Sequence, residues 1–193
     1  MRPDDSWPLA CGTAFKEWAG VCEALSDGRQ SLILRKGGIA EGPNGFVPEH
    51  RLFWLYPTHI HELEQGLRFP RDQALVSDAP SNVVAVRTLV ETGPIGWVDR
   101  LERLIELEDF HVWNEATVER RFHYRKPGLW VLGVRVYRRA EPWLVRLTPE
   151  HAGCKTWVPL DPPLETDGVT PVLGDQESHR VMDHIRSTLK LER

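Results

Sequence analysis

The sequence predicts a single α+β domain in which a mixed, mostly antiparallel sheet is flanked by peripheral helices. The chain has 193 residues, a usual length for one domain, and 41% of them are hydrophobic, which is enough to form a core. Strand-like and helix-like segments do not alternate regularly, which disfavours a doubly wound parallel sheet. Because no repeat or linker divides residues 1–193, we expect one domain with its core over about residues 13–190.

The first part of the chain predicts a helix followed by two strands. Apolar residues recur at helical spacing from Thr13 to Leu25, and Asp27-Gly28 is typical of a turn. Pro57 is expected to end the second strand, and Thr58 to cap a short helix. In order, the expected elements are a helix over 13–25, a strand over 29–36, a loop over 37–50, a strand over 51–56 and a helix over 58–65. We expect the two strands to form a long hairpin.

The second part of the chain predicts more strands and three helices. Asn114 is a typical helix cap, and the segment 129–137 is apolar at nearly every position, which indicates a strand buried on both faces. The expected elements are a strand over 83–91, helices over 97–107 and 114–123, strands over 129–137, 144–147 and 157–160, and a helix that begins at 175.

Positive charge is concentrated in one segment of an otherwise acidic chain. Residues 120–146 contain eight Arg or Lys and one Glu, a net charge of +7, which leaves −11 for the rest of a chain whose total is −4. Such a stretch can bind phosphate groups. The alternative is that these cations pair with acidic residues elsewhere in the chain.

The stretch SLILRKGG is the first candidate site. It is not a nucleotide-binding P-loop, because the lysine precedes the glycines and no Ser or Thr follows. We expect Arg35, Lys36 and the pair Gly37-Gly38 to contact phosphate, in a loop longer than a hairpin needs. The alternative is a solvated loop with charges that protect a sheet edge.

Acidic residues and histidines suggest a second site. Glu41, Glu49, His50 and Lys36 are the catalytic candidates, and Glu49, His50 and His61 are the candidate metal ligands. A divalent metal ion is therefore the one cofactor that the sequence suggests. The alternative is ordinary surface polarity near a helix start.

Aromatic residues alternate with cations around the basic segment. Aromatic rings can stack on bases while cations contact phosphates. The rings are Trp113, Phe122, Tyr124 and Trp130, and the cations are Arg120, Arg121, Arg125 and Lys126. The alternative is that the rings belong to the core and the arginines to its rim.

The sequence also bears on the compartment. Three cysteines argue against a disulfide scaffold, the N-terminus shows no signal peptide, and no apolar run approaches the length of a membrane span. We therefore expect a cytoplasmic protein with no membrane partner. The sequence makes no prediction of the oligomeric state.

Several short motifs in order, FKEW, LILRKGGI, EHRLFWLYPT, FHVW, GVRVYR and GCKTWV, resemble the bacterial family called domain of unknown function 1802. The resemblance covers about residues 13–190 and implies no settled activity. The positions that match recurring motif positions are Lys16, Glu17, Arg35, Lys36, Gly37, Gly38, Glu49, His50, Tyr56, His61 and Trp157. The strand pattern also resembles the small barrels of the PUA and ASCH type, which bind RNA or modified bases.

Three functions follow as hypotheses. The first is nucleic-acid or nucleotide binding, in which Arg35, Lys36 and Arg135 contact phosphate and Trp113 or Tyr56 stacks on a base. The second is a metal-dependent nuclease or hydrolase. The third is a structural or partner-binding domain that uses exposed tryptophans.

Overall fold

A computed structural model describes residues 6–36, 46–59, 66–69, 82–151, 153 and 155–191. The strands are β1 (Ala10–Trp18), β2 (Leu32–Arg35), β3 (Leu52–Thr58), β4 (Val83–Val98), β5 (Leu129–Arg146), β6 (Trp157–Glu165) and β7 (Val169–Pro171). The α-helices are α1 (Ala19–Ser26), α2 (Leu101–Ile105), α3 (Glu115–His123) and α4 (Asp175–Leu189). Short 3₁₀ turns η4 and η5 occupy Glu108–Phe110 and Pro149–His151. Among the described helices, none is long and apolar enough to cross a membrane.

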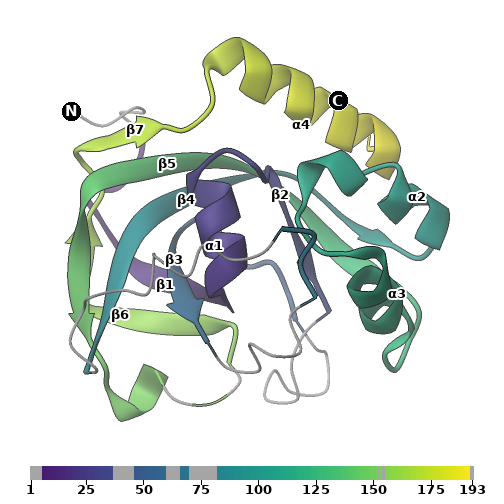
Figure 1. Cartoon of the computed structure of the whole chain (residues 1–193). Coiled ribbons are helices and arrows are strands. Elements are labelled where there is room, and N and C mark those ends of the chain that lie inside the picture. The colour runs from purple at the N-terminus through teal and green to yellow at the C-terminus, as the bar shows by residue number, and fades with distance from the viewer. Residues whose placement is uncertain are drawn as a thin grey trace.

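The strands form one sheet in the order β2-β5-β4-β3-β1-β6, and β7 adds to β5. Only β1 and β3 run parallel among the described pairs, and the other pairs are antiparallel. In Figure 1 the sheet curls around α1, with α2 and α3 together at one side and α4 across the top. The expected mixed, mostly antiparallel sheet with peripheral helices is therefore confirmed.

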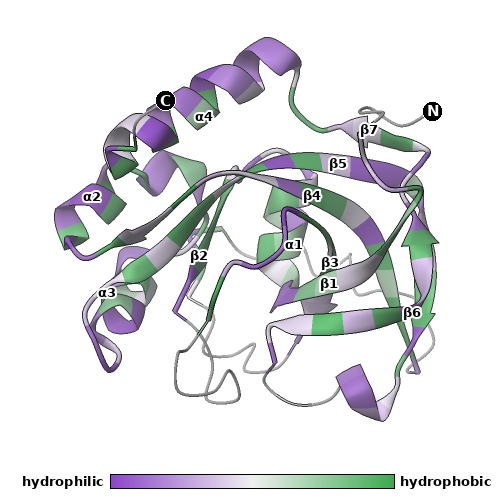
Figure 2. Ribbon diagram, turned by 180° about the vertical axis from the view of Figure 1, so that it is seen from behind, coloured by the Kyte–Doolittle hydropathy of each residue, from purple (hydrophilic) through white to green (hydrophobic). Residues whose placement is uncertain are grey.

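The sheet carries a hydrophobic cluster on each face, because successive strand residues point to opposite sides. In β3, Phe53 and Leu55 join the cluster that packs against α1 and the other helices, whereas Trp54 and Tyr56 join the second cluster. α4 is mainly hydrophilic in Figure 2 and buries Ile185 and Leu189 in the first cluster. The protein thus buries both faces of its sheet.

A polar bridge links the two terminal strands of the sheet. Arg35, the last residue of β2, donates through Nη2 to the hydroxyl of Thr156, which immediately precedes β6. Its Nη1 lies 4.0 Å from Oε2 of Glu17, a carboxylate that is only 2% exposed. Burial raises the pKa of Glu17, and the charges of Arg35 and Arg121 partly offset this effect. We call Arg35, Glu17 and Thr156 the seam bridge.

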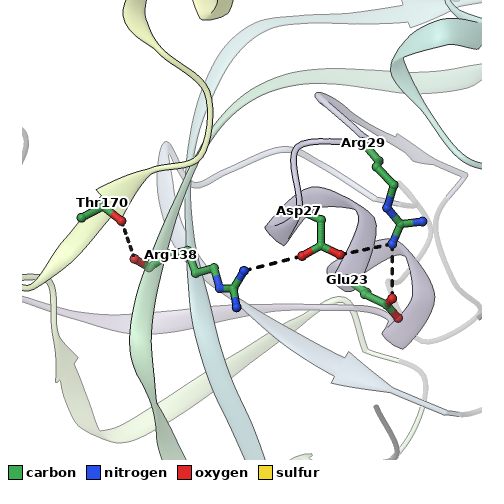
Figure 3. Close-up of polar contacts among 5 residues, drawn as sticks. All are labelled: Glu23, Asp27, Arg29, Arg138 and Thr170. Carbon is green, nitrogen blue, oxygen red and sulfur yellow. Dashed lines mark hydrogen bonds and ion pairs between the residues drawn. The ribbon is translucent and has the colours of Figure 1, made fainter. Parts of the chain in front are cut away.

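A second polar network holds α1 against the sheet at the surface. Asp27, just after α1, forms ion pairs with Arg138 of β5 at 3.6 Å and Arg29 at 3.3 Å, and Arg29 also reaches Glu23 at 3.2 Å. Figure 3 shows this chain of contacts, with the Thr170 hydroxyl of β7 donating to the Arg138 carbonyl oxygen. The network joins three segments that lie far apart in sequence, residues 23–29, β5 and β7.

Some sequence expectations were wrong. The segment 13–18 belongs to strand β1, which pairs with both β3 and β6, so apolar residues on both of its faces gave an apparent helical spacing. The expected hairpin does not form, because β2 pairs with β5 and β3 lies between β1 and β4. Pro57 and Thr58 lie in β3, and the rest of the expected helix, 60–65, lies outside the described residues. Trp97 lies in β4, which ends at Val98, rather than starting a helix, and the expected strand at 144–147 is mostly part of β5.

We predict that Arg35→Leu lowers the free energy of unfolding by about 3–5 kcal/mol, because the substitution leaves the Glu17 carboxylate buried beside one fewer cation. Urea denaturation measures the loss. The double variant Glu17→Gln, Arg35→Leu should recover more than half of it, since no buried charge then remains at the seam bridge. A loss below about 1 kcal/mol for Arg35→Leu would contradict this role.

Candidate nucleic-acid interface

The candidate interface is the C-terminal part of α3 and the loop that follows it, residues 120–126, which we call the cationic loop. Its sequence, RRFHYRK, contains four Arg or Lys and no acidic residue. The helix begins because the Asn114 side chain accepts a hydrogen bond of 2.9 Å from the Thr117 amide. Val118 and Phe122 bury one face of the helix in the core, so the cationic loop is held against the sheet.

Lys36 holds the cationic loop in place through hydrogen bonds to its backbone. Its ammonium donates to the carbonyl oxygens of Phe122 at 3.0 Å and Gly128 at 2.6 Å, and also to that of Lys126. The last carbonyls of a helix carry partial negative charge and repel anions. Lys36 neutralises this charge, so a phosphate can approach the end of α3.

A half-buried tryptophan lies beneath the loop. The Lys36 and Lys126 ammonium groups lie 5.3 and 5.9 Å from the centroid of the Trp97 ring. Gly128 has φ +126, and a Cβ there would lie 2.4 Å from the same ring. The loop therefore packs directly on the end of β4, at a position where only glycine fits.

The electrostatics of the loop favour an added anion. The Lys36 and Lys126 ammonium groups both lie over the Trp97 ring, and burial together with the positive charge of Lys126 lowers the pKa of Lys36. No described carboxylate forms an ion pair with Arg125 or Lys126. A phosphate placed between such groups would relieve their repulsion.

Three of the four arginines in β5 are already occupied. In β5, Arg135 pairs with Asp175, Arg138 with Asp27 and Arg139 with Asp167. Pairing with acids elsewhere in the chain thus accounts for three of the four β5 arginines, all except Arg146. The cationic loop adds two cations, Arg125 and Lys126, that form no ion pair with a described carboxylate.

The tip of the loop exposes one aromatic ring. Tyr124 is 42% exposed, and the guanidinium of Arg125 lies 5.2 Å from its ring centroid. Arg125 has φ +62, a conformation that is strained for a residue with a Cβ. With this backbone conformation, the Arg125 guanidinium lies beside the accessible Tyr124 ring.

The predicted phosphate contacts are spread over the molecule. Lys36 supports the cationic loop, Arg35 belongs to the seam bridge, and Arg135 lies at α4 with its guanidinium 5.4 Å from the Tyr137 ring. The pair Gly37-Gly38 lies outside the described residues. The structure therefore does not bring these cations together.

The rings predicted to stack are both in the interior. Trp113 is 5% exposed and packs on Trp18, with 5.2 Å between ring centroids. Tyr56 is 3% exposed and belongs to the second cluster. None of the eight tryptophans is exposed, so the partner-binding hypothesis lacks the exposed tryptophans on which it depended.

The predicted metal ligands are only partly described. Glu49 is exposed, and half-buried His50 packs against Trp157 with 4.7 Å between ring centroids. Glu41 and His61 lie outside the described residues. Within the described ranges no three His, Cys, Asp or Glu side chains are grouped so that they could hold a metal ion. The metal site stays a prediction.

The sequence interpretation missed Trp97 and the anchoring role of Lys36. The Trp97 contact depends on pairing of β4 with β5, where Trp97 lies opposite Trp130. The glycine that follows the cations in RKPG was the local signal of a close approach. The carbonyl partners of Lys36 lie 86 to 92 residues away in sequence, and no local pattern identifies them.

A buried histidine lies near the start of α3. His111 is 2% exposed, and neither of its ring nitrogens has a hydrogen-bond partner in the described part of the chain. Burial, and to a smaller extent the charge of Arg68, lower its pKa from 6.5 to about 4. Arg68 itself donates to the carbonyl oxygens of Glu108 and His111, so it stays near the ring.

Comparison with known proteins identifies the family. The model for the family described as Domain of unknown function (DUF1802) matches residues 14–184. The chain belongs to this family. No curated protein matches the DUF1802 chain.

Three solved structures resemble the DUF1802 chain. A serine-to-alanine mutant of ZmASCH, from Zymomonas mobilis, has a TM-score of 0.43 at 13% identity and covers 92% of this chain and 98% of its own. ASCH from Zymomonas mobilis has a TM-score of 0.43 at 12% identity, with coverages of 89% and 93%. A tyrosine-to-phenylalanine mutant of ZmASCH has 0.45 at 12%, with coverages of 89% and 96%. They agree with the expected ASCH likeness, and at TM-scores below 0.5 they support no further conclusion.

We predict that Lys36→Met lowers the free energy of unfolding by about 2 kcal/mol, less than three charge-assisted hydrogen bonds would suggest, because the ammonium is partly solvated. Lys36→Arg should restore only part of this stability, since a planar guanidinium cannot reach three carbonyls arranged around an ammonium. Urea denaturation measures both variants. Equal stability of Lys36→Met and the wild type would contradict the anchoring role.

The protein should become less stable as the pH falls from about 6.5 to about 4. In this window the unfolded chain protonates His111 and the folded chain does not, so the stability present above the unfolded pKa is lost, by about 3 kcal/mol at most. NMR titration of the histidine rings gives the pKa directly. The variant His111→Leu should show a shallower pH dependence, and a His111 pKa near 6.5 would refute the prediction.

Proposed function

We propose that this protein binds single-stranded nucleic acid through the cationic loop. The observation that carries the proposal is an accessible ring, Tyr124, with the guanidinium of Arg125 beside it and Lys126 next in sequence, where neither cation forms an ion pair with a described carboxylate. An exposed ring can stack only on a base that is free of its complementary strand. The contact therefore favours single strands over duplexes.

The phosphate would lie between Arg125 and Lys126. Each phosphate neutralised releases counterions, so the affinity should fall as the salt concentration rises. Lys36 would contribute by its position rather than by direct contact, because carbonyl oxygens take its hydrogen bonds. The base would stack on Tyr124 in place of solvent.

Three substitutions test the loop directly. We predict that Tyr124→Ala weakens binding by about 1–3 kcal/mol through loss of stacking. Lys126→Gln should weaken binding and lower the salt slope by about 0.7 for a single strand. Arg125→Gly should also weaken binding yet leave the stability equal or higher, because glycine adopts φ +62 without strain. Fluorescence anisotropy with labelled single-stranded and duplex RNA and DNA at several salt concentrations measures all three.

The matched control is Arg138→Gln. It removes one positive charge from the same basic segment, at a surface where Arg138 pairs with Asp27 (Figure 3). Its affinity and salt slope should equal those of the wild type. Equal losses for Arg138→Gln and Lys126→Gln would show that net charge, and not the loop, determines binding. Absence of binding to any of the four nucleic acids at low salt would refute the proposal.

A further inference from the structure

A second group of cations lines a hollow in the surface between α2 and the end of α4. The hollow has a volume of about 580 Å³, within the range of about 300–1,000 Å³ that ligand-binding pockets occupy. Its cations are Arg100, Arg103 and Lys190, and its acids are Glu102 and Glu106. We call it the α2–α4 hollow.

The chemistry of the lining restricts what the hollow can bind. Every residue that lines it is polar or charged. Pockets for small drug-like ligands are mostly apolar, whereas interfaces with nucleic acid are polar and rich in Arg and Lys. None of the three cations forms an ion pair with a carboxylate in the described part of the chain, so they remain available to an anionic partner.

Lys190 has a backbone conformation that glycine normally adopts at the end of a helix. It follows α4 with φ +56, in the left-handed region. Among the described residues other than glycine, only Arg125 of the cationic loop shares a positive φ, at +62. The chain thus keeps a strained cation at both places, and such strain concentrates at functional sites.

The hollow and the cationic loop meet at the end of β4. Leu189, just before Lys190, packs on this strand, because a Cβ on Gly96 would lie 3.3 Å from Leu189 Cδ2. The next strand residue, Trp97, has the Lys126 ammonium 5.9 Å from its ring centroid. Figure 1 shows α2 and α3 together at one side, with the C-terminal end of α4 next to α2. A strand bound at the loop can therefore continue past the end of β4 into the hollow.

The two acids give the hollow a means of distinguishing bases. A carboxylate only accepts hydrogen bonds, and the amino groups of cytosine, adenine and guanine donate them. Uracil and thymine carry a carbonyl oxygen where cytosine carries its amino group, so they would place an acceptor against an acceptor. Glu102 and Glu106 are four positions apart and lie on the same side of α2.

We propose that a single strand bound at the cationic loop extends into the α2–α4 hollow, which selects bases that carry an amino group. Arg100, Arg103 and Lys190 contact phosphates of the strand. Glu102 and Glu106 accept hydrogen bonds from the amino groups of its bases. This inference rests on the proposed function and adds to it a base preference.

Fluorescence anisotropy with labelled oligocytidine and oligouridine tests the preference. Both are pyrimidine RNAs of equal length, about 16 nucleotides, so charge and stacking on Tyr124 are matched and the amino group differs. We expect the wild type to bind oligocytidine at least about fivefold more tightly, the lower end for one base contact. In the double variant Glu102→Gln, Glu106→Gln the ratio should fall to about one, because an amide can also donate to uracil.

Lys190→Gly separates binding from stability. Glycine adopts φ +56 without strain, so the melting temperature should stay equal or rise. The affinity for oligocytidine should fall, and the salt slope should decrease by about 0.7, the value for one phosphate of a single strand. The matched control is Arg180→Gln, which removes an exposed cation of α4 that does not line the hollow and should change neither quantity.

Three results would overturn this inference. One is equal affinity of the wild type for the two tracts. The second is a gain in affinity for both tracts in Glu102→Gln, Glu106→Gln with their ratio unchanged, which would show that the acids only repel the strand. The third is wild-type affinity and salt slope in Lys190→Gly. If Tyr124→Ala still weakens binding in these cases, the proposed function stands and this inference alone fails, whereas absence of all binding refutes the proposed function itself.

Discussion

The fold depends on the seam bridge, because its three residues connect parts of the sheet that no backbone ladder joins. β2 and β6 are the terminal strands, and Arg35 and Thr156 bring the end of one to the start of the other. Glu17 lies between them in β1, almost completely buried. A buried carboxylate is costly unless a cation compensates it, so the chain must place Arg35 at this point for the curled sheet to be stable.

The same strand end determines where Lys36 lies. Arg35 and Lys36 are adjacent, yet Arg35 reaches Thr156 whereas Lys36 reaches the carbonyls at the end of α3. Both cations thus form their hydrogen bonds within the protein. Lys36 supports the cationic loop, whose side chains carry the exposed positive charge. In the proposed function, Lys36 contributes to phosphate binding indirectly, through the cationic loop that it holds.

Sequence patterns predicted the parts of the fold that depend on local interactions. The Asn114 side chain caps α3, as its residue type predicts, and the apolar run from Leu129 is a strand buried on both faces. The patterns failed where distant pairing decides the outcome. β1 was mistaken for a helix because β3 and β6 bury it on both sides, and β5 takes the place beside β2 that a hairpin would have given to β3. For the same reason the candidate site moved from Arg35 and Arg135 to Tyr124, Arg125 and Lys126, whose surroundings depend on α3, β4 and β5 together.

Arg125 opposes the stability of the fold, and this separates it from the structural positions. Glycine at position 125 would adopt φ +62 without strain. Arg35, Glu17 and Lys36 are different, because replacing any of them removes contacts that the fold needs. Residues that cost stability without supporting the structure concentrate at functional sites. Arg125 meets this criterion, because it keeps a strained backbone conformation and holds a cation beside the exposed ring of Tyr124 without supporting the core.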